Sequence, residues 1–351
     1  DAVANGWNKN ASKYINKLES NFAKYLNCKY AIATSSCTGA MQIALMSLGL
    51  KKGDEVIVPN ITWVATAKAV SYVGATPVFA DIETDDWTIK PESIEKLINK
   101  KTKAIIPVHL YGQPANMSKI MSIAKKNKLF ILEDAAPAIG AEFNKKKCGT
   151  FGDFAAFSFQ GAKLLVSGEG GMLVTNNYNL YKKALKISNH GRNEKKKFVI
   201  DSDGVKFKMS NVQAALAVGQ LERINELIAL KRRIFNWYYN ELKNIKNISL
   251  NKESNNTKSI YWMTSILLNK KINCSRSYFI EELLKNKIDT RPVFPELSSF
   301  TIWGKKSKKK LKFLNSSLIG ERAINLPSGV CLTKNEIINV CNKIKLILKS
   351  I

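Results

Sequence analysis

The sequence predicts an α/β fold in which a mostly parallel sheet is covered by helices on both faces. Short apolar runs of strand length alternate with amphipathic, helix-like stretches through the first half of the chain. This alternation is typical of parallel sheets, whose strands are buried on both faces by the intervening helices. The chain has 351 residues, which is enough for about two domains with substantial cores.

The elements of the first half are expected to alternate regularly between strand and helix. The expected strands are residues 30–34, 55–58, 76–79, 104–108 and 129–132. The expected helices are residues 40–48, 65–72, 91–98 and 117–126. Two further strands, 154–159 and 171–175, are expected on either side of Lys163.

The second half is expected to complete the large domain and to form a smaller α+β domain. Apolar residues recur at helical intervals from 212 to 242, which predicts one long amphipathic helix. A polar stretch, 244–258, separates it from an expected strand at 260–268 and helices at 277–286 and 334–350. We therefore predict a large domain at 1–240 and a small domain at 241–351, with the lysine-rich segment 304–312 as a solvated surface.

The composition argues against several classes of protein. No apolar run approaches the roughly 18 residues of a membrane span, and the N-terminus is polar. Cysteines are scattered without the CxxC spacing of a zinc site, and the chain has only two histidines, His109 and His190. We expect a cytoplasmic protein with reduced thiols, no metal site and no membrane partner.

The formal net charge of +27 could indicate a nucleic-acid-binding protein. However, the lysine clusters are spread along the chain, and aromatic residues are not interleaved with them. We favour a lysine-rich surface over nucleic-acid binding, although the charge would attract an anionic small substrate.

Lys163 is the most informative single residue. It follows an expected strand on a turn of small residues, Gly161 and Ala162, which places it for burial. Burial lowers the pKa of a lysine and makes its amine nucleophilic toward an aldehyde. Such an amine could form a Schiff base with pyridoxal phosphate (PLP), although a surface lysine is the common alternative.

The segment around Ser36, Cys37 and Thr38 is a candidate phosphate site. It lies where an expected strand runs into a helix, and the free N–H groups at a helix N-terminus bind phosphate. An ordinary Ser or Thr helix cap is the alternative. The hydroxyl of Ser158, five residues before Lys163, could reach the same phosphate; a plain strand serine is its alternative.

Trp63 and Asp134 also follow expected strands, where open α/β sheets bind ligands. The ring of Trp63 could stack on an aromatic cofactor, or it could belong to the core. A carboxylate at the end of a buried strand, such as Asp134, is costly unless it is paired with a cation. A protonated pyridine nitrogen would be such a cation, whereas the alternative is a helix N-cap.

Together these motifs resemble the DegT/DnrJ/EryC1/StrS family of PLP-dependent nucleotide-sugar aminotransferases, which belong to the fold-type I aminotransferases. The resemblance runs nearly from end to end. Its main motifs are PVHLYG at 107–112, EDAA at 133–136, GTFGD at 149–153, SFQGAK at 158–163, GEGG at 168–171, HGR at 190–192 and MSNVQAA at 209–215. Residues 133–175 and 290–292 most resemble the perosamine-synthase-like branch, which aminates C4 of a 4-keto-6-deoxyhexose.

The resemblance implies a role for each matching residue. Lys163 would be the Schiff-base lysine and the general acid–base group, and Asp134 would pair with the pyridinium. Trp63 would stack on the ring, while Ser36, Cys37, Thr38 and Ser158 would bind the phosphate. Asn211 would reach the phosphate from the partner subunit of a homodimer with shared active sites.

The resemblance also implies L-glutamate as amino donor and a dTDP- or GDP-linked 4-keto sugar as acceptor. Arg192, Lys208 and Arg291 are candidates for binding the diphosphate, with surface salt bridges as the alternative. Amination at C3 of a 3-keto sugar is a neighbouring possibility. Relatives that act as dehydratases carry histidine in place of the lysine, and Lys163 argues against that class.

Three positions depart from the family pattern. Cys37 stands where glycine is usual, which is tolerable because only its N–H is needed. Pro137 replaces a polar residue, so a contact near the cofactor hydroxyl could be absent. Gln160 occupies a variable position.

Overall fold

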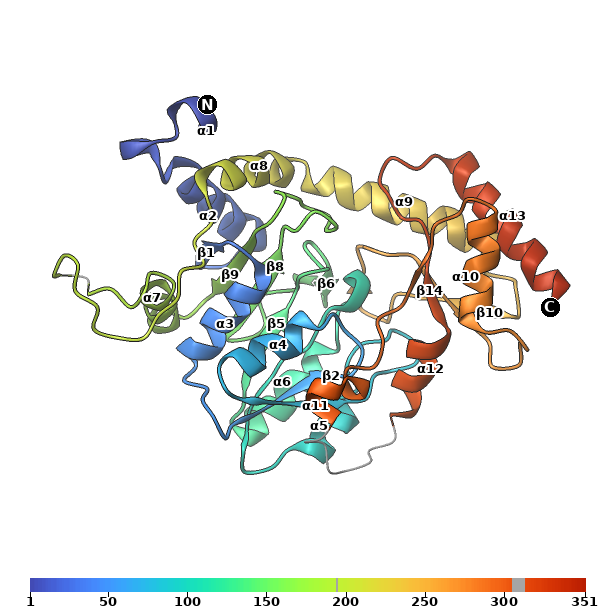
Figure 1. The fold of residues 1–351 in the computed structure, drawn as a ribbon, viewed down its shortest axis with the longest axis horizontal. Coiled ribbons are helices and arrows are strands. Elements are labelled where there is room, and N and C mark those ends of the chain that lie inside the picture. Colours follow the sequence, from blue (N-terminus) through green and yellow to red (C-terminus); the bar gives the residue numbers. More distant parts are fainter. Residues whose placement is uncertain (194, 305–312) are drawn as a thin grey trace.

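The computed structural model describes residues 1–193, 195–304 and 313–351. The expected lysine-rich surface at 304–312 therefore lies almost wholly outside the described residues. Figure 1 shows a larger body built around one sheet and a smaller one around α10 and α13, with α9 running from the first toward the second. Within the described ranges, no helix is long and apolar enough to cross a membrane.

The large sheet has seven strands in the order β1-β9-β8-β5-β4-β2-β3. Its strands are β1 (Tyr30–Thr34), β2 (Glu55–Pro59), β3 (Thr76–Ala80), β4 (Thr102–Ile105), β5 (Phe130–Asp134), β8 (Phe154–Ser158) and β9 (Gly171–Thr175). Only β9 runs antiparallel to its two neighbours, β1 and β8. The prediction of a mostly parallel sheet is confirmed.

Side chains of each strand alternate between two buried layers, which explains why the strands read as continuous apolar runs. In β8, Phe154 and Ala156 pack in a cluster with α3 and α4, whereas Ala155 and Phe157 pack in a cluster with α2 and α8. A further cluster beneath α5 and α6 completes the second face. The helices of this body are α1 (Ala2–Asn5), α2 (Lys13–Leu26), α3 (Cys37–Ser47), α4 (Ala65–Tyr72), α5 (Pro91–Leu97), α6 (Met117–Asn127), α7 (Tyr178–Ile187) and α8 (Asn211–Glu222).

The smaller body has its own sheet and core. Its strands lie in the order β10 (Ile248–Leu250), β12 (Ser265–Leu268), β14 (Ala323–Asn325) and β13 (Arg291–Pro292). Its helices are α10 (Arg276–Lys285), α12 (Leu314–Arg322) and α13 (Lys334–Ser350), and α11 (Thr301–Gly304) lies before α12. The buried cluster here begins with Ile234 and Phe235 of α9 (Ile224–Leu242), so one helix contributes to both cores. The division at residue 240 stays a prediction.

The predicted single helix 212–242 is wrong, because α8 ends at Glu222 and α9 begins at Ile224. Arg223 adopts φ −102° and ψ 7°, and its N–H bonds to the Gln220 carbonyl three residues back. The apolar positions keep a helical spacing across this break, so the sequence pattern does not show it. Packing decides it: α8 lies against α2, whereas α9 continues to α13.

Two predicted strands are shorter than expected. The 104–108 run ends its regular pairing at Ile105, because Pro107 cannot donate to a ladder. In the 260–268 run only Ser265–Leu268 is a strand, and Tyr261 has a left-handed φ of 48°. The polar 244–258 stretch holds β10 and also β11 (Thr257–Lys258), which joins β6 (Glu142–Phe143) and β7 (Lys146–Lys147) in a three-stranded sheet.

Candidate active site

One cavity of about 450 Å³ opens where the parallel strands of the large sheet end. Its walls include most of the predicted cofactor residues: Ser36, Cys37, Thr38, Trp63, Asp134, Ser158 and Lys163. These residues lie far apart in the sequence, between positions 36 and 163. They meet because parallel strands present their carboxyl ends at one edge of the sheet. Two further lining residues are Pro137, which replaces the polar residue usual in the family, and Gln160, at a position that varies in the family.

The start of α3 forms one wall of the cavity. The Ser36 hydroxyl is the N-cap and accepts a hydrogen bond from the Gly39 N–H at 3.0 Å. The helix-cap alternative is therefore correct, but it is compatible with phosphate binding because the hydroxyl hydrogen can still be donated. Gly171 permits this arrangement, since a Cβ there would lie 2.6 Å from the Cys37 nitrogen.

Asp134 ends β5 at the base of the cavity and is 4% exposed. Its Oδ2 accepts a hydrogen bond from the Thr66 hydroxyl at 2.7 Å, and its Oδ1 accepts one from the Ala136 N–H at 3.1 Å. No helix follows β5 in this fully described stretch, so the N-cap alternative is wrong. The carboxylate is held from two sides and lines the wall where a cationic ring nitrogen would be stabilised.

Glu133, the residue before Asp134, anchors the end of β5 from the opposite face. Its fully buried carboxylate accepts hydrogen bonds from the N–H groups of Gly149, Phe151 and Gly152 at 2.7–2.8 Å. His109 Nε2 lies 3.0 Å from it, and His109 Nδ1 accepts from the Ala115 N–H, so Nε2 carries the proton. This network accounts for the PVHLYG, EDAA and GTFGD motifs as supports of Asp134.

Lys163 lies on a tight turn in which the Gly161 N–H bonds to the Gly168 carbonyl and the Lys163 N–H bonds to the Gln160 carbonyl. The side chain is partly buried and points to the cavity rather than to open solvent. Burial lowers the pKa of Lys163, while the Asp134 carboxylate opposes that shift. The amine is therefore more readily deprotonated than an ordinary lysine, as a nucleophile or base requires.

Trp63 is 58% exposed, which excludes the core alternative. Its ring lies on the cavity wall, 5.7 Å between centroids from Phe294. Ser158 ends β8 beside Lys163 and is buried, with its side chain on the same cavity. An exposed flat ring and a buried hydroxyl in one cavity fit a planar phosphate-bearing ligand.

Several cavity residues were not predicted from the sequence, and three of them contact predicted site residues: Thr66, Trp262 and Phe294. Thr66 lies in the first turn of α4, three residues after Trp63, but no pattern in the sequence shows that its hydroxyl would reach Asp134. Trp262 and Phe294 come from the second half of the chain, far from the motifs. No sequence signal could have placed these two rings against the cavity, because both lie far along the chain from the motifs and join the core of the larger body only on folding.

Asn211 and the predicted substrate residues do not line this cavity. The Asn211 side chain accepts from the Tyr14 N–H at 2.8 Å and donates to the Gly6 carbonyl of the same chain. Arg192 and Lys208 are both exposed, and their charges interact. The backbone of Lys208 forms an isolated β-bridge with Thr34, just before the phosphate segment. Arg291 forms an exposed ion pair with Asp289 at 3.0 Å, as in the salt-bridge alternative.

The residues present fit PLP. The start of α3 and Ser158 offer donors for a phosphate, Trp63 offers an exposed ring, and Asp134 offers a held carboxylate. Lys163 supplies the amine. Among the described residues, no group of three or more His, Cys, Asp or Glu could hold a metal ion.

Comparison with known proteins agrees with this geometry. The sequence model of the DegT/DnrJ/EryC1/StrS aminotransferase family matches residues 1–345. A GDP-perosamine synthase of Vibrio cholerae is 38% identical over 345 residues, covering 98% of this chain and 94% of the relative. A GDP-perosamine synthase of Escherichia coli O157:H7 is 38% identical over 96% of this chain and 91% of its own length.

Solved structures show the same fold. DesV of S. venezuelae, in complex with a ketimine intermediate, has a TM-score of 0.90 at 28% identity, covering 96% of this chain and 89% of that one. An aminotransferase of Psychrobacter cryohalolentis has a TM-score of 0.90 at 28% identity, covering 97% and 92%. With the cavity and its lysine, these matches identify the chain as a PLP-dependent aminotransferase of the DegT/DnrJ/EryC1/StrS family.

Proposed function

We propose that the chain transfers an amino group from L-glutamate to a GDP- or dTDP-linked 4-keto-6-deoxyhexose, giving a 4-amino-4,6-dideoxy sugar nucleotide. The observation that carries this proposal is the convergence of Lys163, Asp134 and the start of α3 on one cavity. The sugar substrate is supported by relatives named GDP-perosamine synthase, which are 38% identical over nearly the whole chain.

Each side chain has a distinct task in this reaction. PLP, when bound, supplies an electron-withdrawing ring that stabilises negative charge on a substrate carbon. Asp134, held by Thr66, would keep the ring nitrogen protonated. The start of α3 and Ser158 would bind the phosphate, and Trp63 would cover the ring. Lys163 Nζ would take a proton from the donor and return one to the acceptor.

A basic cluster lies beside the phosphate-binding wall. Lys208 is an exposed residue, but partial burial of its amine and the nearby charges of Lys206 and Arg192 lower the pKa of this group, so the three cations form one cluster. Such a cluster would bind the diphosphate of a sugar nucleotide by charge-assisted hydrogen bonds. Binding energy from that remote group would help to position the keto carbon.

The proposal is tested by incubating the protein with PLP, L-glutamate and a panel of keto-sugar nucleotides. We expect a product that gains an amino group at C4, identified by mass and by NMR, from a GDP- or dTDP-linked 4-keto-6-deoxyhexose. The control is the same panel without glutamate. Reaction of a 3-keto sugar alone would move the protein to the C3-aminating group, and loss of the 3-hydroxyl without amination would indicate a dehydratase.

We also propose a homodimer in which Asn211 of each chain serves the partner's cavity. Asn211 does not reach the cavity of its own chain, although it lies at the start of α8. Beside it on α8, Val212 and Leu216 are 38% and 56% exposed, and Trp7 is 62% exposed on the N-terminal segment that holds Asn211. An apolar surface of this kind is expected to be covered by another chain. A cytoplasmic location and the absence of nucleic-acid partners stay predictions.

Mixing two inactive variants would test the shared site. Lys163→Ala removes the amine, and Asn211→Asp keeps the oxygen that accepts from Tyr14 but places a charge against the phosphate. Hybrid dimers would contain one intact site, so mixing should restore up to about a quarter of wild-type activity. The matched control mixes Lys163→Ala with Asp134→Asn. Both side chains line the cavity of their own chain, so each site of a hybrid dimer would carry one defect and no recovery is expected. An active monomer in sedimentation would contradict the proposal.

A further inference from the structure

Trp262 is a buried residue, 6% exposed, that lines the cavity beside Lys163 and belongs to the core of the larger body. The Lys163 Nζ lies 4.0 Å from the centroid of the indole. The indole Nε1–H donates a hydrogen bond to the Ala162 carbonyl at 2.8 Å, in the turn that carries the lysine. The Trp262 ring also stacks on Tyr111, with centroids 5.9 Å apart. One side chain thus contacts both the reactive amine and the backbone beside it.

The backbone of Trp262 is fixed by a buried lysine of α9. The Lys231 Nζ donates hydrogen bonds to the carbonyl of Trp262, at 2.9 Å, and to that of Ser328. Burial lowers the pKa of Lys231 to about 8. A neutral amine still has two N–H groups, so it can serve both carbonyls in either protonation state. The attachment of Trp262 to α9 therefore does not depend on a salt bridge.

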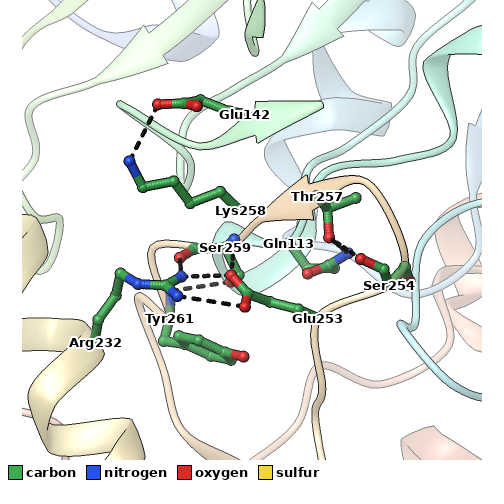
Figure 2. A network of polar contacts seen from close by, with 9 residues as sticks. All are labelled: Gln113, Glu142, Arg232, Glu253, Ser254, Thr257, Lys258, Ser259 and Tyr261. Carbon is green, nitrogen blue, oxygen red and sulfur yellow. Dashed lines mark hydrogen bonds and ion pairs between the residues drawn. The ribbon is translucent and has the colours of Figure 1, made fainter. Parts of the chain in front are cut away.

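The residue before Trp262 is held in an uncommon conformation by the network in Figure 2. Arg232 pairs with Glu253 and donates to the Ser259 carbonyl, while Glu253 accepts from the Ser259 N–H at 2.6 Å. Tyr261 has φ 48° and stacks on Phe235 at 3.5 Å between centroids. Such a backbone conformation persists only where its surroundings determine it. These contacts fix the backbone before Trp262 and therefore the direction of its side chain.

The face of an indole attracts a cation, and tryptophan is the strongest aromatic partner for an ammonium group. An amine that alternates between a bound and a free state needs a defined place when it is free, because a mobile lysine loses its orientation for proton transfer. We propose that Trp262 is a positioning residue for Lys163: its indole face holds the free amine, and its N–H fixes the turn that carries it. This role rests on the amino-transfer function proposed above.

Other charged or titratable groups also face Lys163 and must be considered in a test. Asp134 lines the same cavity and favours the ammonium form, and Glu169 also lines it. Cys37 is buried, and burial together with Asp134 raises the pKa of its thiol, so it stays neutral. None of these groups is altered by a substitution at Trp262. Burial also lowers the pKa of Lys163, and a substitution that admits water would raise the midpoint, so only a lowered midpoint reports loss of the indole.

The test measures the titration of Lys163 in cofactor-free protein by competitive acetylation across a pH range, read by mass spectrometry of its peptide. The ring stabilises the ammonium, so its removal should lower the midpoint by about 0.4 to 1.5 pH units in Trp262→Leu. Trp262→Phe keeps a ring that attracts the ammonium more weakly, so its midpoint should fall between those of the wild type and Trp262→Leu. Trp303→Leu, a buried tryptophan of another cluster, is the matched control and should leave the midpoint unchanged.

An unchanged or raised midpoint in a folded Trp262→Leu or Trp262→Phe protein would overturn the proposal. If the leucine variant does not fold, as judged by circular dichroism, the phenylalanine variant decides. Because the measurement uses neither cofactor nor substrate, it is independent of the proposed reaction. If the midpoints follow the expected order but no keto sugar reacts, the contact between Trp262 and Lys163 is supported and the proposed function is refuted.

Discussion

Lys163→Ala is expected to abolish amino transfer while the chain remains folded. The amine lies on the cavity wall with a lowered pKa, and it is both the group that would attach the cofactor and the group that would move the proton. A positioned acid–base group alone raises the reaction rate by roughly 10²–10⁴-fold. With attachment also lost, we expect activity below about one thousandth of wild type.

Two measurements separate this result from simple unfolding. Wild-type protein with PLP should show the visible absorption band of a lysine-bound cofactor, and Lys163→Ala should lose the band while keeping its circular dichroism spectrum. Lys163→Arg should also be inactive, since a guanidinium stays protonated at neutral pH. Lys285→Ala, which alters an exposed lysine paired with Glu282 on α10, is the control and should be fully active. Wild-type turnover in Lys163→Ala would refute the assignment.

Asp134→Asn is expected to keep the fold but to lower kcat by roughly 10²- to 10³-fold. The amide has nearly the same shape and retains one oxygen to accept from Thr66 or Ala136. It lacks the charge that would hold the ring nitrogen protonated, and removing one member of a buried charge pair typically costs about 3–5 kcal/mol. The measurements are kcat with a reactive keto sugar and the dissociation constant of PLP.

The matched control for this prediction is Thr66→Val. It removes the 2.7 Å hydrogen bond to Asp134 but leaves the carboxylate charged. A single hydrogen bond to a charged group contributes about 1.5–3 kcal/mol at most, so a smaller loss is expected than in Asp134→Asn. Near-normal kcat in Asp134→Asn with cofactor bound would show that the carboxylate only braces the Ala136 turn.

Local sequence patterns predicted most elements of the larger body. The strands β1, β2, β3 and β9 begin where predicted, and α4 has the predicted bounds. Their apolar runs are short, and the helical and strand periods differ clearly, so nearby residues carry enough information. The break at Arg223 was missed because it barely disturbs the helical spacing, and Pro107 shortened β4 by removing a donor.

The sequence by itself also predicted residues that the structure brings to one cavity: an amine at Lys163, a carboxylate at Asp134, a helix start at Ser36 and a ring at Trp63. Each follows a strand, and parallel strands bring their carboxyl ends to one edge, so the order of the motifs was sufficient. Only the tertiary structure decided that Trp63 is exposed, that Thr66 holds Asp134, and that Trp262 lies against Lys163. Trp262 is 100 residues from the Ala162 carbonyl it contacts, and no periodic pattern spans that distance. Its position depends on how it packs into the core of the larger body, which is a property of packing rather than of local sequence.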